Sequence, residues 1–259
     1  MSDGVRLDLN DRVALITGGS RGIGAAAVRM FVQASGRVVF NYQRAREQAA
    51  KLAKECGGAA RCLAVQADLS GLTGAGELVD TTVRHFGGVD VLVVNHGIWP
   101  PDDIPIDEMP EKHWSRTVGI NLDSTFALVK YAVGQMKKQK KGGHVVVVSS
   151  TAGQRGEAFH CDYAATKGAV ISMVKGLSTE LAPHGIYVNC VAPGWVSTDM
   201  AAPTLSDPIR SAEALAKIPL GRPGSPEEIA APILFLCTRH AGFITGEIFN
   251  VNGGAVLVG

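Results

Sequence analysis

Short apolar runs alternate along the chain with longer segments in which apolar residues recur at helical spacing. The runs show little polar alternation, a pattern typical of strands that are covered on both faces of a parallel sheet. The predicted strands are residues 13–16, 37–42, 60–65, 89–94, 144–149, 186–191 and 247–251. The predicted helices are residues 22–35, 45–56, 74–86, 111–138, 162–182 and 226–238. This order predicts an α/β fold, a doubly wound Rossmann fold whose parallel sheet has about seven strands.

One segment interrupts the alternation. Residues 195–226 contain five prolines, at positions 203, 208, 219, 223 and 226, and a short helical piece at 208–216. A long connection inside a compact domain is usually functional, and one that follows the carboxyl end of a strand overhangs the ligand crevice of such a sheet. We therefore expect a single domain over residues 1–259, with a substrate lid at about 195–226.

Composition narrows the class of protein. With 46% apolar and 19% charged residues the chain can bury a large core, and its net charge of +1 does not indicate nucleic acid or an anionic membrane as a partner. The five cysteines are scattered without the spacing of metal ligands, so no metal site is expected and the thiols are expected to be reduced. The amino terminus has no apolar segment typical of a secretion signal. These features predict a cytoplasmic protein.

A glycine-rich turn follows the first predicted strand and opens the first helix. Gly18, Gly22 and Gly24 stand in the pattern T-G-x-x-x-G-x-G, with Ser20, Arg21 and Ile23 between them. Glycines at such a turn let backbone N–H groups approach a pyrophosphate at a helix amino terminus. The sequence therefore predicts a dinucleotide site here, and a purely structural turn is the alternative.

The end of the second strand indicates which dinucleotide is bound. An NAD site is expected to place a carboxylate there, roughly 20 residues after the glycines, to hold the ribose 2′-hydroxyl. Here the chain reads Asn41-Tyr42-Gln43-Arg44, and Arg21 lies inside the glycine turn. Two guanidinium groups and no carboxylate suit a 2′-phosphate, so NADP(H) is predicted. The alternative is that both arginines are solvated surface residues.

Two more strand ends carry candidate cofactor contacts. Asp68 can accept a hydrogen bond from an adenine amino group, with Leu69 supplying a backbone contact, or it can cap the next helix. Asn95 and Gly97 end the fourth strand, where a small residue allows close approach of the cofactor. His96 between them is interpreted as a packed or solvated histidine.

A hydroxyl, a phenol and an ammonium group are predicted to meet near the same edge of the sheet. Tyr163 and Lys167 are separated by four residues on a predicted helix and so share a face, and Ser150 closes the preceding strand. Tyr163 is the predicted proton donor to a carbonyl oxygen, and Ser150 is predicted to orient that oxygen. Lys167 is predicted to lower the pKa of Tyr163 and to hold the nicotinamide ribose, while the cofactor supplies hydride.

Together these motifs resemble the short-chain dehydrogenase/reductase family over the whole chain. The matching segments are Thr17-Gly18 to Gly24, Asp68-Leu69, Asn95 to Gly97, Asn121, Ser150 to Gly153, Tyr163 to Lys167 and Pro193 to Thr198. The resemblance implies that Asn121 holds a proton-relay water connected to Lys167. It also implies that Thr198 contacts the nicotinamide carboxamide, that Pro193 and Gly194 shape the turn beneath the ring, and that Val196 contacts the cofactor. His96 departs from the alanine usual in the family.

Within that family the chain is most similar to 3-oxoacyl-(acyl-carrier-protein) reductases, which act in fatty acid biosynthesis. The similarity lies in Asn41-Tyr42 and in residues 243–254. It implies a carbonyl or acyl-thioester substrate, acyl carrier protein as a partner, and a homotetramer. Lys141 is basic where the carrier is expected to dock, but His184 stands where arginine is expected. A short-chain alcohol, ketone or sugar dehydrogenase of the same family is the alternative.

Two classes outside this family compete. Gly18-Gly-Ser20-Arg-Gly22 also matches the nucleophile elbow of α/β-hydrolases, but only one strand precedes it and the hydrolase reading leaves Tyr163 and Lys167 without a role. A nucleotide-binding regulator on the same fold has no need of the catalytic residues. Cys161 beside His160 is interpreted as a bystander thiol. Residues 154, 155, 157 and 159, together with Trp99, Trp195 and the lid, are expected to line the substrate pocket.

Overall fold

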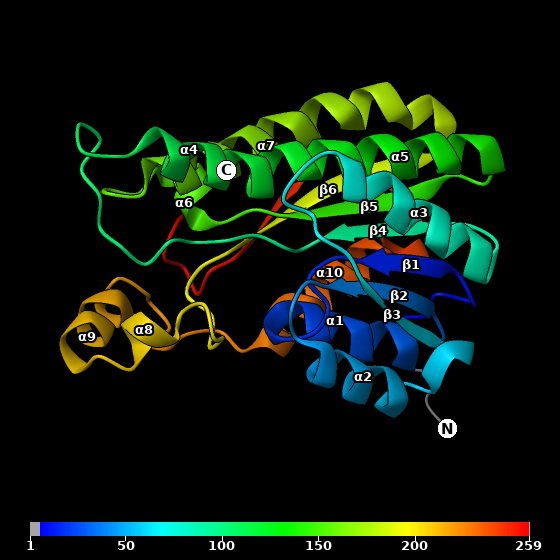
Figure 1. Ribbon diagram of the computed structural model, residues 1–259, viewed down its shortest axis with the longest axis horizontal. Coiled ribbons are helices and arrows are strands. Elements are labelled where there is room, and N and C mark those ends of the chain that lie inside the picture. The colour runs from blue at the N-terminus through cyan, green and yellow to red at the C-terminus, as the bar shows by residue number, and fades with distance from the viewer. Residues whose placement is uncertain (1–5, 259) are drawn as a thin grey trace.

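A single parallel sheet organises the protein, as Figure 1 shows. The computed structural model describes residues 6–258, and within this range seven strands pair in the order β3-β2-β1-β4-β5-β6-β7. The strands are β1 Val13–Ile16, β2 Arg37–Tyr42, β3 Cys62–Gln66, β4 Val91–Val94, β5 Gly143–Val148, β6 Ile186–Pro193 and β7 Ile248–Val251. The chain runs outward from β1 to β3 and returns beside β1 with β4. This reversal creates the crevice at which open α/β sheets bind ligands.

Helices cover both faces of the sheet because successive strand residues point to opposite sides. On β4, Val91 and Val93 pack in the core on one face of the sheet, whereas Leu92 and Val94 pack in the core on the other face. One layer holds α1 Gly22–Gln33, α2 Arg46–Glu55 and α10 Pro226–Leu236, and the other holds α3 Thr73–Phe86, α5 Ser124–Gln139 and α7 Cys161–Leu181 (Figure 1). Burial on both faces explains why the strands lack polar alternation.

The predicted helix over residues 111–138 is wrong in one respect. The structure divides it into α4 Glu111–Val118, a π-helical turn at Gly119–Asp123 that we call η2, and α5. Two hydroxyls lie against backbone carbonyls of this turn: Ser124 Oγ donates to Ile120 O at 2.6 Å, and Thr125 Oγ1 donates to Asn121 O at 2.8 Å. These hydrogen bonds stabilise a turn that helical periodicity does not reveal, because the apolar residues keep helical spacing on both sides of it and only the phase of the pattern changes.

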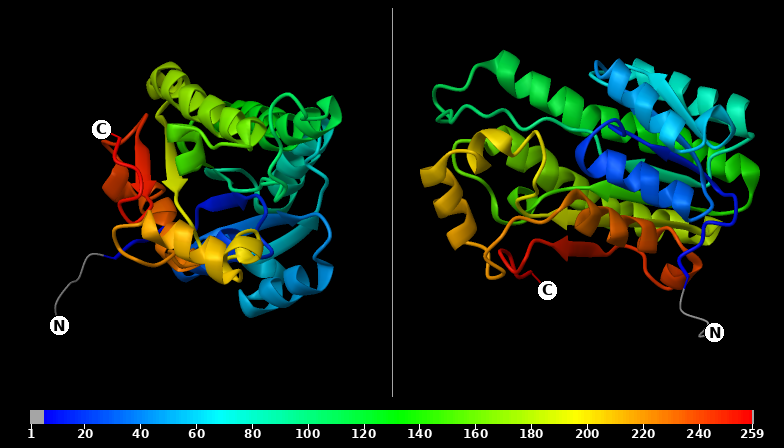
Figure 2. Two further views of the ribbon diagram at one scale, coloured as in Figure 1. Left: turned by 90° about the vertical axis from the view of Figure 1, so that its left-hand side faces the viewer. Right: turned by 90° about the horizontal axis from the view of Figure 1, so that it is seen from below.

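Several short elements were also absent from the prediction. They are α6 Thr151–Arg155, α8 Ala202–Leu205 and the 3₁₀ turns Gly58–Ala60, Ala182–His184 and Arg239–Ala241. Ser150 caps α6, since its Oγ accepts from Ala152 N at 3.1 Å. The predicted helical piece at 208–216 is confirmed as α9 Pro208–Ala216, with the Asp207 side chain as its cap. In Figure 2 α8 and α9 stand apart from both helical layers, beside the carboxyl ends of the strands.

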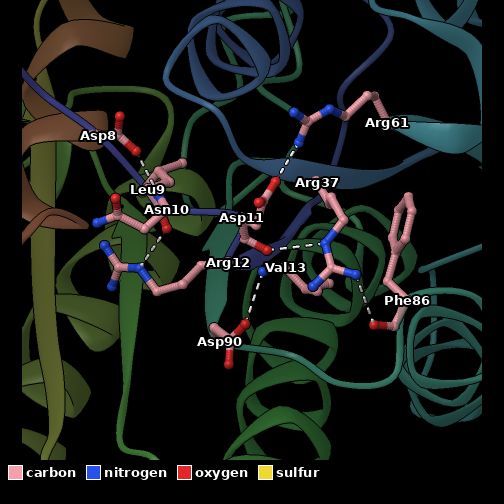
Figure 3. Close-up of polar contacts among 10 residues, drawn as sticks. All are labelled: Asp8, Leu9, Asn10, Asp11, Arg12, Val13, Arg37, Arg61, Phe86 and Asp90. Atoms are coloured by element: carbon pink, nitrogen blue, oxygen red, sulfur yellow. Dashed lines mark hydrogen bonds and ion pairs between the residues drawn. The ribbon is translucent and has the colours of Figure 1, made fainter.

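At the amino ends of the strands, away from the crevice, polar contacts tie the strands and their neighbouring loops together (Figure 3). Val13 N donates to Asp90 Oδ2 at 2.8 Å, which joins β1 to the residue before β4. Arg37 Nε donates to Asp11 O at 2.9 Å, and Arg61 pairs with the Asp11 carboxylate. These contacts fix the amino ends of the strands and leave the carboxyl ends open. Within residues 6–258, no helix combines the length and the apolar character needed to cross a bilayer.

Candidate active site

A cleft of ≈ 860 Å³ lies along the carboxyl ends of the central strands. It brings together nearly all of the predicted site residues from distant parts of the sequence. Those that line it are Gly18, Ser20, Arg21, Gly22, Ile23, Asn41, Tyr42, Arg44, Asp68, Leu69, Asn95, Gly97, Ser150, Tyr163, Lys167, Pro193, Gly194, Val196 and Thr198. Gly24 and Asn121 lie behind this surface and act on it through packing and hydrogen bonds.

The glycine turn forms a cradle that other residues cannot build. Gly18 and Gly22 have φ angles of 63° and 52°, in the left-handed region that favours glycine. A Cβ at Gly24 would lie 2.1 Å from Gly18 O, so the first turn of α1 packs directly against the backbone of the glycine turn. Asn41 Oδ1 accepts from Gly18 N at 2.8 Å, and Asn95 Nδ2 donates to Thr17 O at 3.0 Å. The turn is therefore held in place from two neighbouring strands.

The amino terminus of α1 fits a phosphate group. Arg21, at the N-cap position, makes no side-chain cap, and the first turn of α1 contains no acidic residue. Free N–H groups at a helix amino terminus favour an anion, and the missing Cβ atoms of the glycines leave room for it. These residues fit the pyrophosphate of a dinucleotide.

The adenosine end of the cleft carries both predicted arginines. Arg21 and Arg44 line it, and Arg21 Nη1 lies 3.4 Å from Asp199 Oδ2, with both side chains exposed to solvent. The Asp68 carboxylate accepts from Ser70 N at 2.9 Å and from Gln43 Nε2 at 3.0 Å. The hydrogen bonds from Ser70 hold the pKa of Asp68 below its usual value. Asp68 does not cap α3, whose N-cap is Leu72, so its alternative role as the helix cap is not found.

Ser150, Tyr163 and Lys167 converge at the middle of the cleft. Lys167 Nζ donates to Val148 O at 2.9 Å and lies 5.8 Å from the centroid of the Tyr163 ring. Ser149 Oγ donates to Lys167 O at 2.7 Å, and Gly153 allows α6 to pack against the α7 backbone, since a Cβ there would lie 2.5 Å from Lys167 C. The carboxyl end of β5 and the first turns of α7 are thereby joined. Ser150, Tyr163 and Lys167 therefore line the same part of the cleft.

Burial changes the acid–base chemistry of this group. It raises the pKa of Tyr163 to about 12, while a hydrogen bond to Ser150 lowers it and the charge of Glu157 raises it. Burial lowers the pKa of Lys167 to about 8. The motif predicts that Lys167 lowers the pKa of Tyr163, and this lowering is not found because removal of the phenol from water dominates. Tyr163 thus keeps its proton at neutral pH and is ready to donate it.

Comparison with known proteins fits this geometry. A family model described as enoyl-(acyl carrier protein) reductase matches residues 18–256. The chain is 38% identical over 252 residues to an L-rhamnose 1-dehydrogenase (NAD(P)+) of Azotobacter vinelandii, covering 95% of this chain and 97% of that one. It is also 38% identical over 251 residues to a 3-oxoacyl-(acyl-carrier-protein) reductase of Synechocystis, covering 96% and 98%. A crystal structure from Brucella melitensis, described as a short-chain dehydrogenase/reductase and glucose/ribitol dehydrogenase, superposes with a TM-score of 0.90 at 36% identity, covering 98% of this chain and 100% of that one.

The chain belongs to the short-chain dehydrogenase/reductase family. It is therefore an oxidoreductase of a family that uses nicotinamide cofactors. The resemblance stated from its motifs is confirmed, and so is the parallel seven-stranded sheet. The hydrolase alternative receives no support, because no hydrogen bond joins the Ser20 hydroxyl to a histidine among residues 6–258, and Ser20 lines the nucleotide end of the cleft.

Asn121 of this short-chain dehydrogenase/reductase is held by the π turn η2. Its Oδ1 accepts from Ile98 N at 2.8 Å, and its Nδ2 donates to Ile98 O at 2.9 Å and to Thr166 Oγ1 at 3.3 Å. A Cβ at Gly97 would lie 3.2 Å from Asn121 Oδ1 and 3.5 Å from Lys167 Nζ. Asn121 and Lys167 therefore border the same glycine on its buried side. The proton-relay role of Asn121 stays a prediction.

Of the two expectations for His96, packed or solvated, the structure supports the packed one, and it adds two hydrogen-bond partners that the sequence does not indicate. Its Nε2 lies 2.7 Å from Ser124 Oγ, which already donates to Ile120 O, so Nε2 carries the proton. Its Nδ1 then accepts from Thr17 Oγ1 at 2.8 Å. Burial, and after it the charge of Lys167, lowers the pKa of His96 to about 4. The neutral ring thus links the end of β1 to the start of α5, a role that only the three-dimensional structure reveals.

The substrate end of the cleft is aromatic and charged. Trp99, Arg155, Glu157 and Trp195 line it, as expected, together with Arg116 and Met200. Two expected members do not: Gln154 instead donates to Asn250 Oδ1 at 2.6 Å, and Phe159 is largely exposed. Cys161 does not line the cleft either, in agreement with its interpretation as a bystander.

Proposed function

We propose that this protein is an NADP(H)-dependent oxidoreductase that transfers hydride between nicotinamide and a carbonyl or secondary alcohol. The observation that carries the proposal is the convergence of Ser150, Tyr163 and Lys167 in the cleft whose other end is the glycine turn. A protonated phenol beside a hydroxyl suits proton transfer to a carbonyl oxygen, and a regulatory nucleotide-binding protein does not need it.

Each residue has a defined part. When bound, the nicotinamide cofactor supplies or accepts the hydride. Ser150 orients the substrate oxygen and polarises its bond to carbon, and Tyr163 donates the proton to that oxygen in the reduction. Lys167 stays near the phenol through its bond to Val148 O, and its proposed part is to hold the nicotinamide ribose. Asn121 binds the backbone of Ile98 and lies beside Gly97, so it fixes the loop that borders Lys167.

The choice of NADP(H) rests on charge at the adenosine end. Arg21 and Arg44 line that end, and the β2 terminus offers the neutral side chains of Asn41, Tyr42 and Gln43. Asn41 is buried and bonded to the glycine turn, so it cannot take the place of the carboxylate that holds a free 2′-hydroxyl. A structurally similar protein from Beutenbergia cavernae, described as an NAD(P)-dependent gluconate 5-dehydrogenase, has NADP bound at low occupancy (TM-score 0.89, 31% identity, 97% of this chain and 99% of that one).

The relatives leave two substrate classes, acyl thioesters and sugars. Acyl carrier protein would dock at the mouth of the cleft, where Lys141 and His184 were considered as contacts. Both lie near the amino ends of strands, Lys141 before β5 and His184 before β6. They are therefore at the edge of the sheet opposite the cleft, which weakens the argument for a carrier-bound substrate. We further propose the homotetramer that the resemblance implies.

A direct assay tests the proposal. The full-length protein is mixed with NADPH or NADH and a panel of ketones, and with NADP+ or NAD+ and a panel of secondary alcohols and sugars, while absorbance of the reduced nicotinamide is followed. We expect turnover with at least one panel, and a higher kcat/KM with NADP(H). An ester panel without nucleotide serves as the control for hydrolase activity. Nucleotide-independent ester cleavage with no nicotinamide-linked turnover would contradict the proposal.

A further inference from the structure

Glu157 places a carboxylate in the wall of the cleft at its substrate end, and a substrate bound there has to suit this group. Its carboxylate is half-buried in the cleft wall, close enough to the catalytic phenol that its charge raises the pKa of Tyr163. Burial raises the pKa of Glu157 itself, whereas His160, Arg155 and a hydrogen bond to Trp99 lower it. Trp99 supplies one hydrogen bond to this carboxylate, and a half-buried carboxylate in the cleft wall can accept further hydrogen bonds from a ligand that carries donors.

The turn that presents Glu157 is built at a conformational cost. Gly156 has a φ angle of 79°, and Phe159 adopts 65°, an unfavourable value for a bulky residue. The turn is held by the bond from Ile104 N to Phe159 O at 3.2 Å and by His160 Nε2, which lies 3.2 Å from Asp103 Oδ1. His160 is buried, so the turn is tied firmly to the loop after β4. Glu157 is therefore placed in the cleft by a structure that constrains its backbone.

Two tryptophans complete this end of the cleft. The Trp99 and Trp195 rings meet edge to face with centroids 6.0 Å apart, and Trp99 also packs against His160 at 4.7 Å. They come from the loop after β4 and from the start of the lid, so together they span the opening. Indole faces bind the C–H faces of sugar rings, and Arg155 in the same wall donates to hydroxyl oxygens.

We infer that the substrate is a small polyhydroxy compound, a monosaccharide or the corresponding polyol. Its hydroxyl next to the reacting carbon donates to Glu157, and its C–H face lies against the indoles of Trp99 and Trp195. A hydroxyl both donates and accepts, which matches a wall that holds a carboxylate and a guanidinium. A long acyl thioester offers only acceptors and methylene groups near its ketone, so it adds no donor to the one that Trp99 gives the Glu157 carboxylate.

This inference rests on the proposed function. In the reduction Tyr163 donates its proton to the carbonyl oxygen; in the reverse oxidation the alcohol loses its C–H hydride to the oxidised nicotinamide and its O–H proton to Tyr163, which must first have released its own proton to solvent. The alcohol becomes a carbonyl, either a ketone or a lactone when the carbon is the anomeric one. The cofactor takes up the two electrons that the substrate loses, so the step is balanced.

The test compares substrate panels in wild type and Glu157→Gln. We measure kcat and KM with NADP+ for aldohexoses and pentitols, and with NADPH for a short 3-oxoacyl thioester and for cyclohexanone, which has no hydroxyl. Loss of a charge-assisted hydrogen bond is expected to raise KM for the best polyol at least ~10-fold. Because Glu157→Gln also removes a charge that acts on Tyr163, kcat can change for every substrate, but the KM for cyclohexanone should change less than ~3-fold, which separates loss of a donor site from an effect on the phenol. Glu108→Gln, on the exposed turn before α4, is the matched control and should leave both unchanged.

Binding is measured separately from turnover. Trp99 and Trp195 are two of the three tryptophans in the chain, so sugar binding should change the indole fluorescence. Titration of Tyr163→Phe with the best polyol, in the presence of NADP+, is expected to show saturable binding without turnover. A higher kcat/KM for the thioester than for any polyol, or an unchanged polyol KM in Glu157→Gln, overturns the inference. Absence of nicotinamide-linked turnover with every compound overturns the proposed function instead, and saturable sugar binding would then still support the sugar site.

Discussion

The two ends of the cleft are built differently. At the nucleotide end, buried side chains tie the glycine turn to the neighbouring strand ends: Asn41 Oδ1 accepts from Gly18 N, and Thr17 Oγ1, at the start of the turn, accepts from Asn95 N. At the substrate end, the walls come from the loop after β4, the turn after α6 and the lid, and large apolar side chains such as Ile106, Met200 and Ile209 are exposed there. The first end is pre-organised for one ligand. The second consists of long connections that can change without disturbing the sheet.

Tyr163 lies where the two ends meet, and its replacement should have the largest effect. Tyr163→Phe removes only the hydroxyl, so turnover should fall by at least ~10², the usual contribution of general acid–base catalysis. NADPH affinity, measured by nucleotide fluorescence, should stay within about 2-fold because the glycine turn is untouched. Ser150→Ala should also lose turnover. Turnover of Tyr163→Phe near the wild-type rate would remove the phenol from the mechanism.

The nucleotide end should tolerate no added methyl group at its tightest point. In Gly24→Ala the new Cβ would lie 2.1 Å from Gly18 O, so the glycine turn must move and NADPH affinity should fall by more than ~10-fold. The matched control is Gly176→Ala on α7, where a Cβ would meet nothing within 4 Å and φ is ordinary. That variant should keep its affinity and gain a few tenths to ~1 kcal/mol of stability from helix propensity. Equal affinities in the two variants would mean that the turn is not rigid.

The adenosine edge is the exposed part of the nucleotide end, so its effects should be intermediate. Arg21→Ala should lower the affinity for NADPH by about 10-fold and leave that for NADH nearly unchanged, because only the 2′-phosphate contacts this charge. Asp199→Asn frees Arg21 from its exposed partner and should raise NADPH affinity by less than ~5-fold. Both effects should shrink at high salt. Equal loss of NADPH and NADH affinity in Arg21→Ala would contradict the assignment.

The smallest expected effect concerns the pH dependence of stability at His96. The pKa of His96 in the folded protein is lowered from 6.5 to about 4, so its contribution to the free energy of unfolding is present above pH 6.5 and is lost as pH falls toward 4. The slope from this one group is at most ~1.4 kcal/mol per pH unit. His96→Ala should be less stable than wild type at pH 7 and should lose less stability between pH 6.5 and 4.5, as measured by urea unfolding.

His184→Ala is the control for that measurement, because His184 is exposed in a 3₁₀ turn far from the cleft. It should follow the wild-type curve. If His96→Ala also follows the wild-type curve, then the His96 bridge between Thr17 and Ser124 does not cause the loss of unfolding free energy at low pH.

The sequence predicted what depends on periodicity and on local chemistry. Buried strands have continuous apolar runs, so the sheet was found almost to the residue at β1 and β2, and Tyr163 and Lys167 share a face because helix geometry requires it. The π turn around Asn121 was missed because the apolar residues keep helical spacing on each side of it, and one extra residue changes only the phase of the pattern between the two sides. The His96 bridge and the raised pKa of Tyr163 depend on partners distant in sequence and on burial, which no local pattern contains.

The π turn η2 also limits how the length of this chain can vary. Removing one residue from Gly119–Asp123 would let α4 run directly into α5 as a single regular helix. Every side chain on one side of the deletion would then rotate by about 100° relative to the other side. Either Asn121 would turn away from Ile98, or the buried face of α5 would turn away from the sheet. Insertions and deletions that the lid can absorb should therefore be excluded from these five residues.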